Sequence, residues 1–266
     1  MSLRIIVTVK QVIDPTITQN EFEVDNVMNS MISNSAMPSI VNSFDEYAIE
    51  AALRIKDQDG SHVTVISMGN SFAMEVVKKP LAMGADELIL LQDPAFFNSV
   101  DSYVGALVLN AAINKIDEFD VIISGRQASD WDNGQVPIIL SEMLGIPCVS
   151  LGKKLISLDK NLLVERIVSD GVETLKCPLP LIVTVNSECG SPRYPTVRGI
   201  MVSSNKTPIC WNAQDIGINE DELLPRLQID RVSIPPKNDN CEFIQGDSDR
   251  EKAHNLALKL RESGLI

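Results

Sequence analysis

Short apolar, β-rich runs alternate with segments of helical periodicity through the first half of the chain. Strands are expected over residues 3–9, 62–67, 87–91 and 120–124. Helices are expected between them, over residues 43–56, about 68–83, 101–116 and 135–144. This βαβα order predicts parallel strands with helices on both faces, a doubly wound α/β fold. Such a sheet binds ligands at the carboxyl ends of its strands.

Two local signals refine these helices. Ser43 and Glu46 have the spacing of a capping box, which predicts that the helix over residues 43–56 begins with the Ser43 side chain as its cap, and Gly60 lies beyond its end. Pro80 falls inside the next helical segment, so the last turn of that helix should be kinked or cut short.

The pattern changes after about residue 150. Residues 155–158 and 162–168 flank a polar turn and are expected to form an antiparallel hairpin, and residues 181–186 a further strand. A loop rich in proline and glycine follows, and the stretch 205–247 should be irregular. A final helix begins at a second capping box, Ser248 with Glu251. We therefore expect an α/β domain over residues 1–205 and, over 206–266, an extended arm with an amphipathic helix that docks on another subunit or on its own domain.

Composition narrows the function. With 23 Lys+Arg against 36 Asp+Glu, the net charge is −13, which argues against binding to nucleic acid or to an anionic membrane surface. The sequence has no apolar run long enough to span a membrane and no secretory signal, so a cytoplasmic protein is expected. Five scattered cysteines and two histidines favour neither a disulfide framework nor a metal site.

Common catalytic and nucleotide fingerprints are absent. The first strand is not followed by G-x-G-x-x-G, and neither a P-loop nor a G-x-S-x-G elbow occurs. Two distant histidines leave little for a nucleophile–base pair. The sequence thus gives poor support to a metal-dependent or nucleophilic enzyme.

The most informative segment is the loop over residues 125–136, which follows one strand and opens a helix. Gly125 would let the backbone approach a ligand, and Asn133-Gly134 can supply a tight turn with free N–H groups at the helix start, where anions bind. Asp132 and Gln135 fit a variant of the capping box, and Asp130 or Arg126 could meet a ribose or a phosphate. The same residues would also suit an ordinary polar loop between strand and helix.

Several separate segments give the chain a wider resemblance. They are Val9-Lys10-Gln11-Val12-Ile13-Asp14, Asn42-Ser43-Phe44-Asp45-Glu46, Leu81-Ala82-Met83-Gly84-Ala85-Asp86, the loop over 125–136, and Pro192-Arg193-Tyr194-Pro195-Thr196-Val197-Arg198-Gly199-Ile200-Met201. In this order and spacing they resemble the β subunit of electron transfer flavoproteins, the FixA-like family, over about residues 3–205 and more loosely to the end.

The resemblance implies an electron carrier subunit rather than an enzyme. Its α partner would hold the redox-active FAD, and the heterodimer would shuttle electrons between acyl-CoA dehydrogenases, or related dehydrogenases, and a redox acceptor. The β subunit would itself hold AMP, or a second FAD if the complex is electron-bifurcating with NADH as donor. The C-terminal helix would embrace the α subunit. A remote alternative is a stand-alone adenine-nucleotide-binding enzyme.

Carried over by position, the resemblance also implies two sets of site residues. The nucleotide pocket would comprise Thr8, Asn42, Ser43, Phe44, Asp45, Met68, Gly125, Arg126, Gln127, Ala128, Ser129, Asp130, Trp131, Asp132, Asn133, Gly134, Gln135 and Val136. The loop that docks on the partner dehydrogenase would comprise Glu188, Cys189, Gly190, Ser191, Pro192, Arg193 and Tyr194.

Two departures from the family bear on these expectations. By position, Cys189 replaces the leucine that the family loop usually presents as its docking anchor. The replacement implies a different dehydrogenase or a partner with a smaller receiving pocket. Bifurcating members often read Val-Pro-Asp-Thr near the first strand. Val12-Ile13-Asp14-Pro15 differs, which favours AMP over a second FAD.

Overall fold

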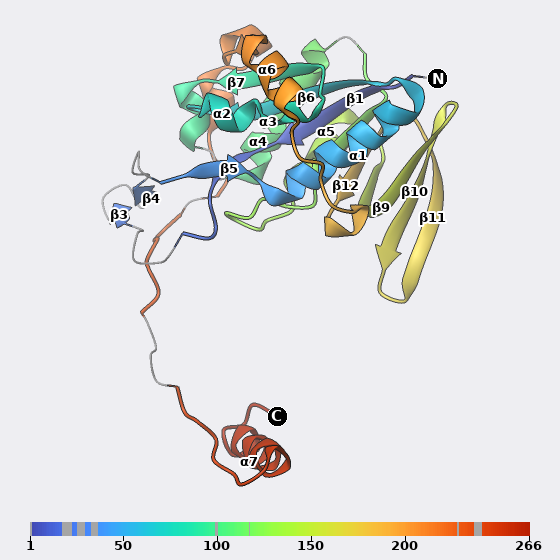
Figure 1. The fold of residues 1–266 in the computed structure, drawn as a ribbon. Coiled ribbons are helices and arrows are strands. Elements are labelled where there is room, and N and C mark those ends of the chain that lie inside the picture. The colour runs from blue at the N-terminus through green and yellow to red at the C-terminus, as the bar shows by residue number, and fades with distance from the viewer. Residues whose placement is uncertain are drawn as a thin grey trace.

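The computed structural model describes residues 2–17, 23–25, 30–32, 37–98, 101–116, 118–227, 229–236 and 241–266. Within them a nine-stranded sheet forms the centre of the molecule (Figure 1). Its strands, in spatial order, are β11 (Gly171–Pro178), β10 (Asn161–Val168), β9 (Cys148–Leu158), β12 (Leu181–Val185), β8 (Val121–Gly125), β1 (Arg4–Val9), β6 (His62–Gly69), β7 (Glu87–Gln92) and β13 (Ile209–Trp211). The strands from β9 to β13 in this order are parallel, and β10 pairs antiparallel with both β9 and β11.

Helices cover both faces of the sheet, as the βαβα alternation predicts. On one face, α1 (Ser43–Asp59), α2 (Met74–Val77) and α3 (Lys79–Met83) pack on a core that includes Ile5, Val7 and Val9 of β1. On the other, α4 (Ser102–Lys115) and α5 (Val136–Leu144) pack on a core that includes Ile6. Successive β1 residues therefore enter opposite cores, which confirms the doubly wound fold.

The strand order creates a ligand-binding position. From β1 the chain passes through α1 to β6 and β7 on one side, and then returns through α4 to β8 on the other side of β1. The connections after β1 and β8 thus leave toward opposite faces of the sheet. Their carboxyl ends form the crevice at which open α/β sheets hold ligands.

The start of α1 differs from the sequence prediction. Asn42, not Ser43, occupies the N-cap position, and no side chain caps this helix among the described residues. The Asn42 amide instead binds the 125–136 loop, donating through Nδ2 to the Gln127 carbonyl at 2.9 Å and accepting from the Ser129 N–H at 3.1 Å. The predicted capping box of Ser43 and Glu46 is wrong, because Ser43 is already the first residue of the helix. The predicted end at Gly60 is confirmed, with its N–H bonded to the Lys56 carbonyl.

The break near Pro80 is confirmed. The region expected as one helix contains two short ones, α2 and α3, separated at Lys78, and Pro80 lies in the first turn of α3. Proline is tolerated there because the first N–H groups of a helix have no partner within it.

The second half contains elements that the sequence pattern did not reveal. The hairpin is confirmed in β9 and β10, but β11 extends it to three strands. The stretch expected to be a loop contains α6 (Val197–Asn205), and β13 adds a strand inside the stretch expected to be irregular. Two small antiparallel sheets pair β2 (Gln11–Ile13) with β5 (Ser39–Val41) and β3 (Glu23–Asp25) with β4 (Ser30–Ile32). Short 3-10 helices occupy Pro94–Asn98, Ser187–Cys189, Gln214–Ile216 and Glu220–Leu223.

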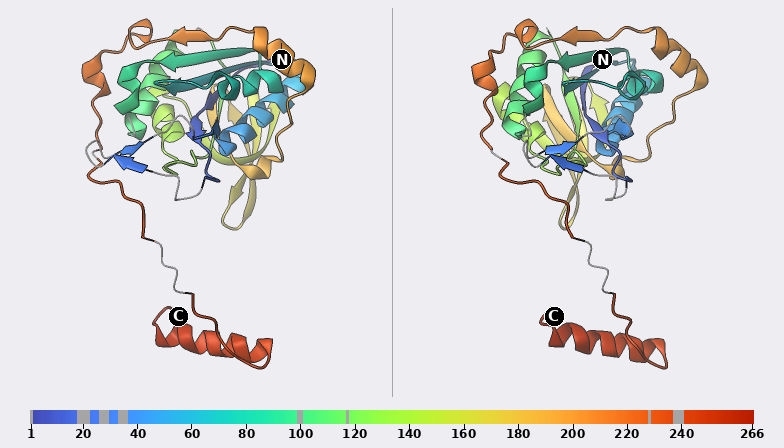
Figure 2. Two further views of the ribbon diagram at one scale, coloured as in Figure 1. Left: turned by 60° about the vertical axis from the view of Figure 1, so that its left-hand side comes forward. Right: turned by 90° about the vertical axis from the view of Figure 1, so that its left-hand side faces the viewer.

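The C-terminal region divides into two parts. Ile216, Ile218 and Leu223 are buried against the core that contains α4. Farther on, α7 (Asp249–Glu262) lies apart from the rest of the molecule (Figure 2), and none of its residues, all of which are described, is buried. Its predicted Ser248 cap is confirmed, because Oγ accepts the Glu251 N–H. Among the described helices, none is long and apolar enough to cross a membrane.

Candidate functional site

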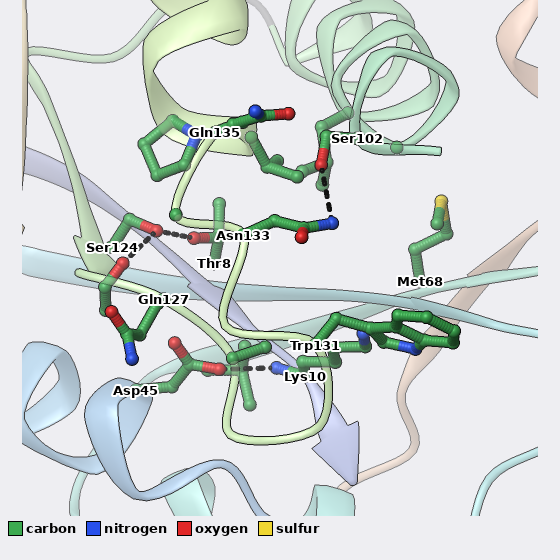
Figure 3. Close-up of a pocket in the computed structure, with 18 of the residues that line it drawn as sticks. Thr8, Lys10, Asp45, Met68, Ser102, Ser124, Gln127, Trp131, Asn133 and Gln135 are labelled. Atoms are coloured by element: carbon green, nitrogen blue, oxygen red, sulfur yellow. Dashed lines mark hydrogen bonds between the residues drawn. The ribbon is translucent and has the colours of Figure 1, made fainter. Parts of the chain in front are cut away.

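A pocket opens at the carboxyl ends of β1, β6 and β8 (Figure 3). Its empty volume is about 880 Å³, part of which is open solvent at the mouth. The walls come from the strand ends, the start of α1, the 125–136 loop, and the first turns of α4 and α5. The residues that line it are Thr8, Val9, Lys10, Asp45, Ile66, Met68, Asp101, Ser102, Gly105, Leu109, Ser124, Gly125, Gln127, Ala128, Trp131, Asn133, Gly134, Gln135, Val136 and Pro137.

The floor of the pocket is a tight junction between β1, β8 and α1. Thr8 Oγ1 donates to Ser124 Oγ at 2.8 Å. Gly125 lies so close to α1 that a Cβ there would stand 2.3 Å from Asp45 Oδ1 and 2.8 Å from the Phe44 carbonyl carbon. The sequence suggested that Gly125 gives room to a ligand. In the structure its missing side chain first gives room to the helix.

Asp45 is a buried carboxyl at this junction, with 5% of its surface exposed. The Lys10 N–H donates to Asp45 Oδ2 at 2.7 Å. Burial raises the pKa of Asp45 to about 7, although hydrogen bonds from Lys10, Asn42 and Gly125 act in the opposite direction. Asp45 thus joins the ends of two strands to the first turn of α1.

The 125–136 loop is held by contacts within it and by Lys10, the residue directly after β1. Lys10 Nζ lies 2.6 Å from Asp130 Oδ2, and Gln127 Nε2 donates to Asp132 Oδ1 at 2.6 Å. Asp132 has φ +52, a left-handed conformation, and Gln135 holds the N-cap position of α5. The predicted capping role of Asp132 is therefore wrong, because its side chain bonds within the loop.

Two helix N-termini face the pocket. At α5, no side chain caps the helix within the described part of the chain, and Gly134 and Gln135 line the cavity directly before its first residue. At α4, Asp101 is the N-cap and accepts the Tyr103 N–H, and the neighbouring Ser102 Oγ lies 3.4 Å from Asn133 Nδ2 (Figure 3). An uncapped N-terminus offers N–H donors and a partial positive charge, so the α5 end suits an anion.

The structure brings together most, but not all, of the residues expected in a nucleotide pocket. Those that line the cavity are Thr8, Asp45, Met68, Gly125, Gln127, Ala128, Trp131, Asn133, Gly134, Gln135 and Val136. Those outside its lining, all of them described, are Asn42, Ser43, Phe44, Arg126, Ser129, Asp130 and Asp132. Asn42, Asp130 and Asp132 shape the loop that forms the wall.

Sequence reasoning did not find the remaining lining residues, which are Val9, Lys10, Ile66, Asp101, Ser102, Gly105, Leu109, Ser124 and Pro137. Lys10 had the clearest signal, since it directly follows the first predicted strand, where ligand-binding side chains are expected. The apolar residues had none, because a pocket wall and a core have the same composition.

The expected docking segment lies far along the chain from this pocket and is tied to α1. Cys189 is only 7% exposed, packs in the core, and donates through Sγ to the Gly152 carbonyl. Burial raises the pKa of its thiol to about 11. The resemblance had placed Cys189 at the position of an exposed docking anchor, whereas in the structure its side chain is buried. Apolar side chains are exposed just after it instead, at Tyr194 (91%), Val197 (77%), Ile200 and Met201.

Comparison with known proteins identifies the family. The model of the electron transfer flavoprotein domain matches residues 31–215. The chain is 37% identical to the caffeyl-CoA reductase-Etf complex subunit CarD of Acetobacterium woodii and 39% identical to the electron transfer flavoprotein subunit beta of Thermoanaerobacterium thermosaccharolyticum, over 99% of this chain and 100% of each relative. With the same coverage it is 31% identical to the acryloyl-CoA reductase electron transfer subunit gamma of Anaerotignum propionicum. The chain therefore belongs to the electron transfer flavoprotein family, as a relative of its β subunits.

Proposed function

We propose that this β subunit holds AMP in the pocket at the strand ends and pairs with an α subunit that carries the redox-active FAD. The heterodimer passes electrons between a CoA-linked flavoenzyme, such as an acyl-CoA dehydrogenase, and a redox acceptor in the cytoplasm. The observation that carries the proposal is the uncapped N-terminus of α5 in the pocket, in a chain that matches electron transfer β subunits over its whole length.

The residues present fit an adenine nucleotide. The phosphate would meet the N–H groups before α5, where Gly134 adopts φ +62. Lys10 supplies a cation on the opposite wall, with Asp130 as its partner. Met68, Leu109 and Val136 offer an apolar surface for the base, and Trp131 adds an aromatic ring at the loop.

In this assignment the protein and the flavin have separate roles. When bound to the α subunit, FAD supplies the redox chemistry. This chain binds a nucleotide, keeps the 125–136 loop in one conformation through Asn42 and Lys10, and offers a docking surface. Because Asn42 and Lys10 already hold the loop in place, the bound nucleotide would mainly add hydrogen bonds that stabilise the folded subunit.

The docking surface is assigned to Tyr194, Val197, Ile200 and Met201, called here the α6 surface. Thr196 caps α6 through the Gly199 N–H, and Gly199 lies against α3, where a Cβ would be 2.2 Å from the Ala82 carbonyl oxygen. This contact turns the apolar side of α6 outward. We assign the α6 surface to the CoA-linked flavoenzyme, because relatives of this chain are named as subunits of CoA-thioester reductase complexes.

A second candidate keeps the pocket but fills it with a second FAD and uses NADH as donor, as in an electron-bifurcating complex. The similarity to the CarD and acryloyl-CoA reductase subunits favours it, since a reductase partner accepts electrons from its carrier. The two candidates predict different small molecules in the purified heterodimer.

The test is mass spectrometry of the small molecules released from the chain co-purified with its α subunit. One FAD and one AMP per heterodimer would support the proposal, and two FAD would support the alternative. Release of FAD alone, at one per heterodimer, would contradict both. Gly105→Leu should abolish AMP retention, because a Cβ at Gly105 already lies 3.7 Å from Val136 Cγ2 across the pocket wall. Asn114→Leu, on the exposed side of the same helix, is the matched control.

A further inference from the structure

A buried carboxylate on α1 holds the segment that leads into the α6 surface. We propose that Glu50 is a positioning residue, which fixes residues 189–193 and thereby sets the α6 surface for contact with the partner flavoenzyme. The inference rests on the proposed docking function, and nothing in the nucleotide pocket is needed for it.

Glu50 is 4% exposed and is shared by two arginines. Arg193 contacts it three times, through Nε to Oε2 at 2.9 Å, through Nη2 to Oε1 at 3.3 Å, and through its backbone N–H to Oε2 at 3.0 Å. Arg54, one turn further along α1, donates through Nε to Oε1 at 2.8 Å. A forked guanidinium on a carboxylate is directional as well as strong.

The second arginine extends the same network into the backbone of the segment. Arg54 Nη1 donates to the Cys189 carbonyl at 2.5 Å and Nη2 to the Ser191 carbonyl at 3.3 Å. Gly190 lies between these two carbonyls at φ +93, and a Cβ there would be 2.9 Å from Arg54 Nη1. The segment therefore follows the shape of a guanidinium that Glu50 itself orients.

The two arginines keep the buried Glu50 carboxyl ionised. Burial alone would raise the pKa of Glu50, but the hydrogen bonds from Arg193 and Arg54 outweigh it and lower the pKa. Arg193 also reaches Asp57 Oδ2 at 2.8 Å, so it bridges two turns of α1. Removing one partner from a buried, paired carboxylate leaves the other charge without compensation.

The network of Glu50, Arg54 and Arg193 holds the chain directly before the α6 surface. Tyr194 follows Arg193 directly, and α6 begins three residues later. Gly199 fixes the first turn of α6 against α3, whereas Glu50 fixes the chain before the helix. Loss of the Glu50 contacts should thus leave α6 in place but free Tyr194, the first residue of the α6 surface.

The experiment uses the heterodimer with its α subunit, a bacterial butyryl-CoA dehydrogenase and butyryl-CoA, and measures the KM for the heterodimer. Glu50→Gln keeps the shape of the side chain and removes its charge. Arg193→Gln removes the same contacts from the exposed side, and Arg193→Lys keeps only the charge. Glu46→Gln is the matched control, because Glu46 is also an α1 glutamate in an ion pair, but with Lys79. Hydrogen exchange of residues 187–201 is followed in parallel.

We expect Glu50→Gln and Arg193→Gln to raise the KM at least fivefold with kcat within twofold, and to speed exchange in residues 187–201. Arg193→Lys should recover part of the KM, and Glu46→Gln should change neither quantity. Faster exchange with an unchanged KM would overturn the docking role, and unchanged exchange would overturn the positioning role. A wild-type heterodimer that transfers no electrons would instead contradict the proposed function, while exchange would still decide whether Glu50 holds the segment.

Discussion

Gly125→Ala tests the junction on which the pocket is built. The new methyl group would stand 2.3 Å from Asp45 Oδ1, 2.8 Å from the Phe44 carbonyl carbon and 2.9 Å from the Asp45 backbone nitrogen. Two of these three atoms belong to the backbone of the first turn of α1, so a change of rotamer cannot relieve the contact. Either α1 or the end of β8 must move.

The size of the effect follows from these contacts. Inserting a methyl group into a well-packed site typically destabilises by about 1–3 kcal/mol. We expect the upper end of this range, because the shift also disturbs the hydrogen bond from the Lys10 N–H to Asp45, worth about 1 kcal/mol. In a chain of this length, each kcal/mol lowers Tm by about 2 °C.

Urea unfolding followed by circular dichroism, with reversibility checked by dilution, measures the change in free energy. Gly105→Ala is the matched control. Gly105 lines the same pocket, but a Cβ there meets Val136 Cγ2 at 3.7 Å and Met68 Cε at 3.9 Å, ordinary contact distances. Because Gly105 is inside α4, alanine should stabilise it by about 0.5–1 kcal/mol. A Gly125→Ala chain as stable as the wild type would refute the close-approach argument.

Three further predictions concern other parts of the molecule. The pKa of Asp45 is about 7 in the fold against an ordinary value of 3.8, so the folded state holds the proton more tightly, and the free energy of unfolding should fall by on the order of 4 kcal/mol as the pH rises from 4 to 7. Urea unfolding of Asp45→Asn should lack this pH dependence, and an equal dependence in the variant and the wild type would contradict the prediction. Asp101→Ala removes the acceptor of the Arg226 and Leu227 N–H groups, so trypsin should cut after Arg226 faster than in the wild type, and an unchanged rate would argue against this attachment. Thr196→Ala removes the cap of α6 at a cost of about 1 kcal/mol; amide exchange in its first turn should accelerate, and unaltered exchange would show that the cap is dispensable.

The sequence pattern was sufficient for the parallel half of the fold, because its strands and helices carry their own periodicity. It failed where tertiary contacts decide. Helix α6 has nine residues and a glycine, Gly199, in its first turn, and its position depends on contact with α3. Strand β13 has three residues, too few for any period, and forms because β7 offers a free edge. Neither contact can be read from local sequence.

The candidate site was predictable in location but not in detail. The loop after β8 was expected at the pocket because parallel strands place their carboxyl ends together. The roles of Asn42 and Asp132 were not, because both side chains suit a helix cap and the structure uses both to brace the loop. An Asn or Asp before a helix can hydrogen-bond either to the N–H groups of that helix or to another segment, and the tertiary contacts decide which of the two forms.

The isolation of α7 has a consequence for how this subunit survives in a cell. A 14-residue helix is marginal in water on its own, and its described contacts with the rest of the chain reach only the segment just before it, such as Lys259 with Glu242 and Asn255 with the Gln245 carbonyl. An orphan copy would thus expose a fraying tail with leucines at positions 256, 258 and 265, a natural entry point for proteases. Matched synthesis of the two subunits would then be enforced by degradation of whichever copies remain unassembled.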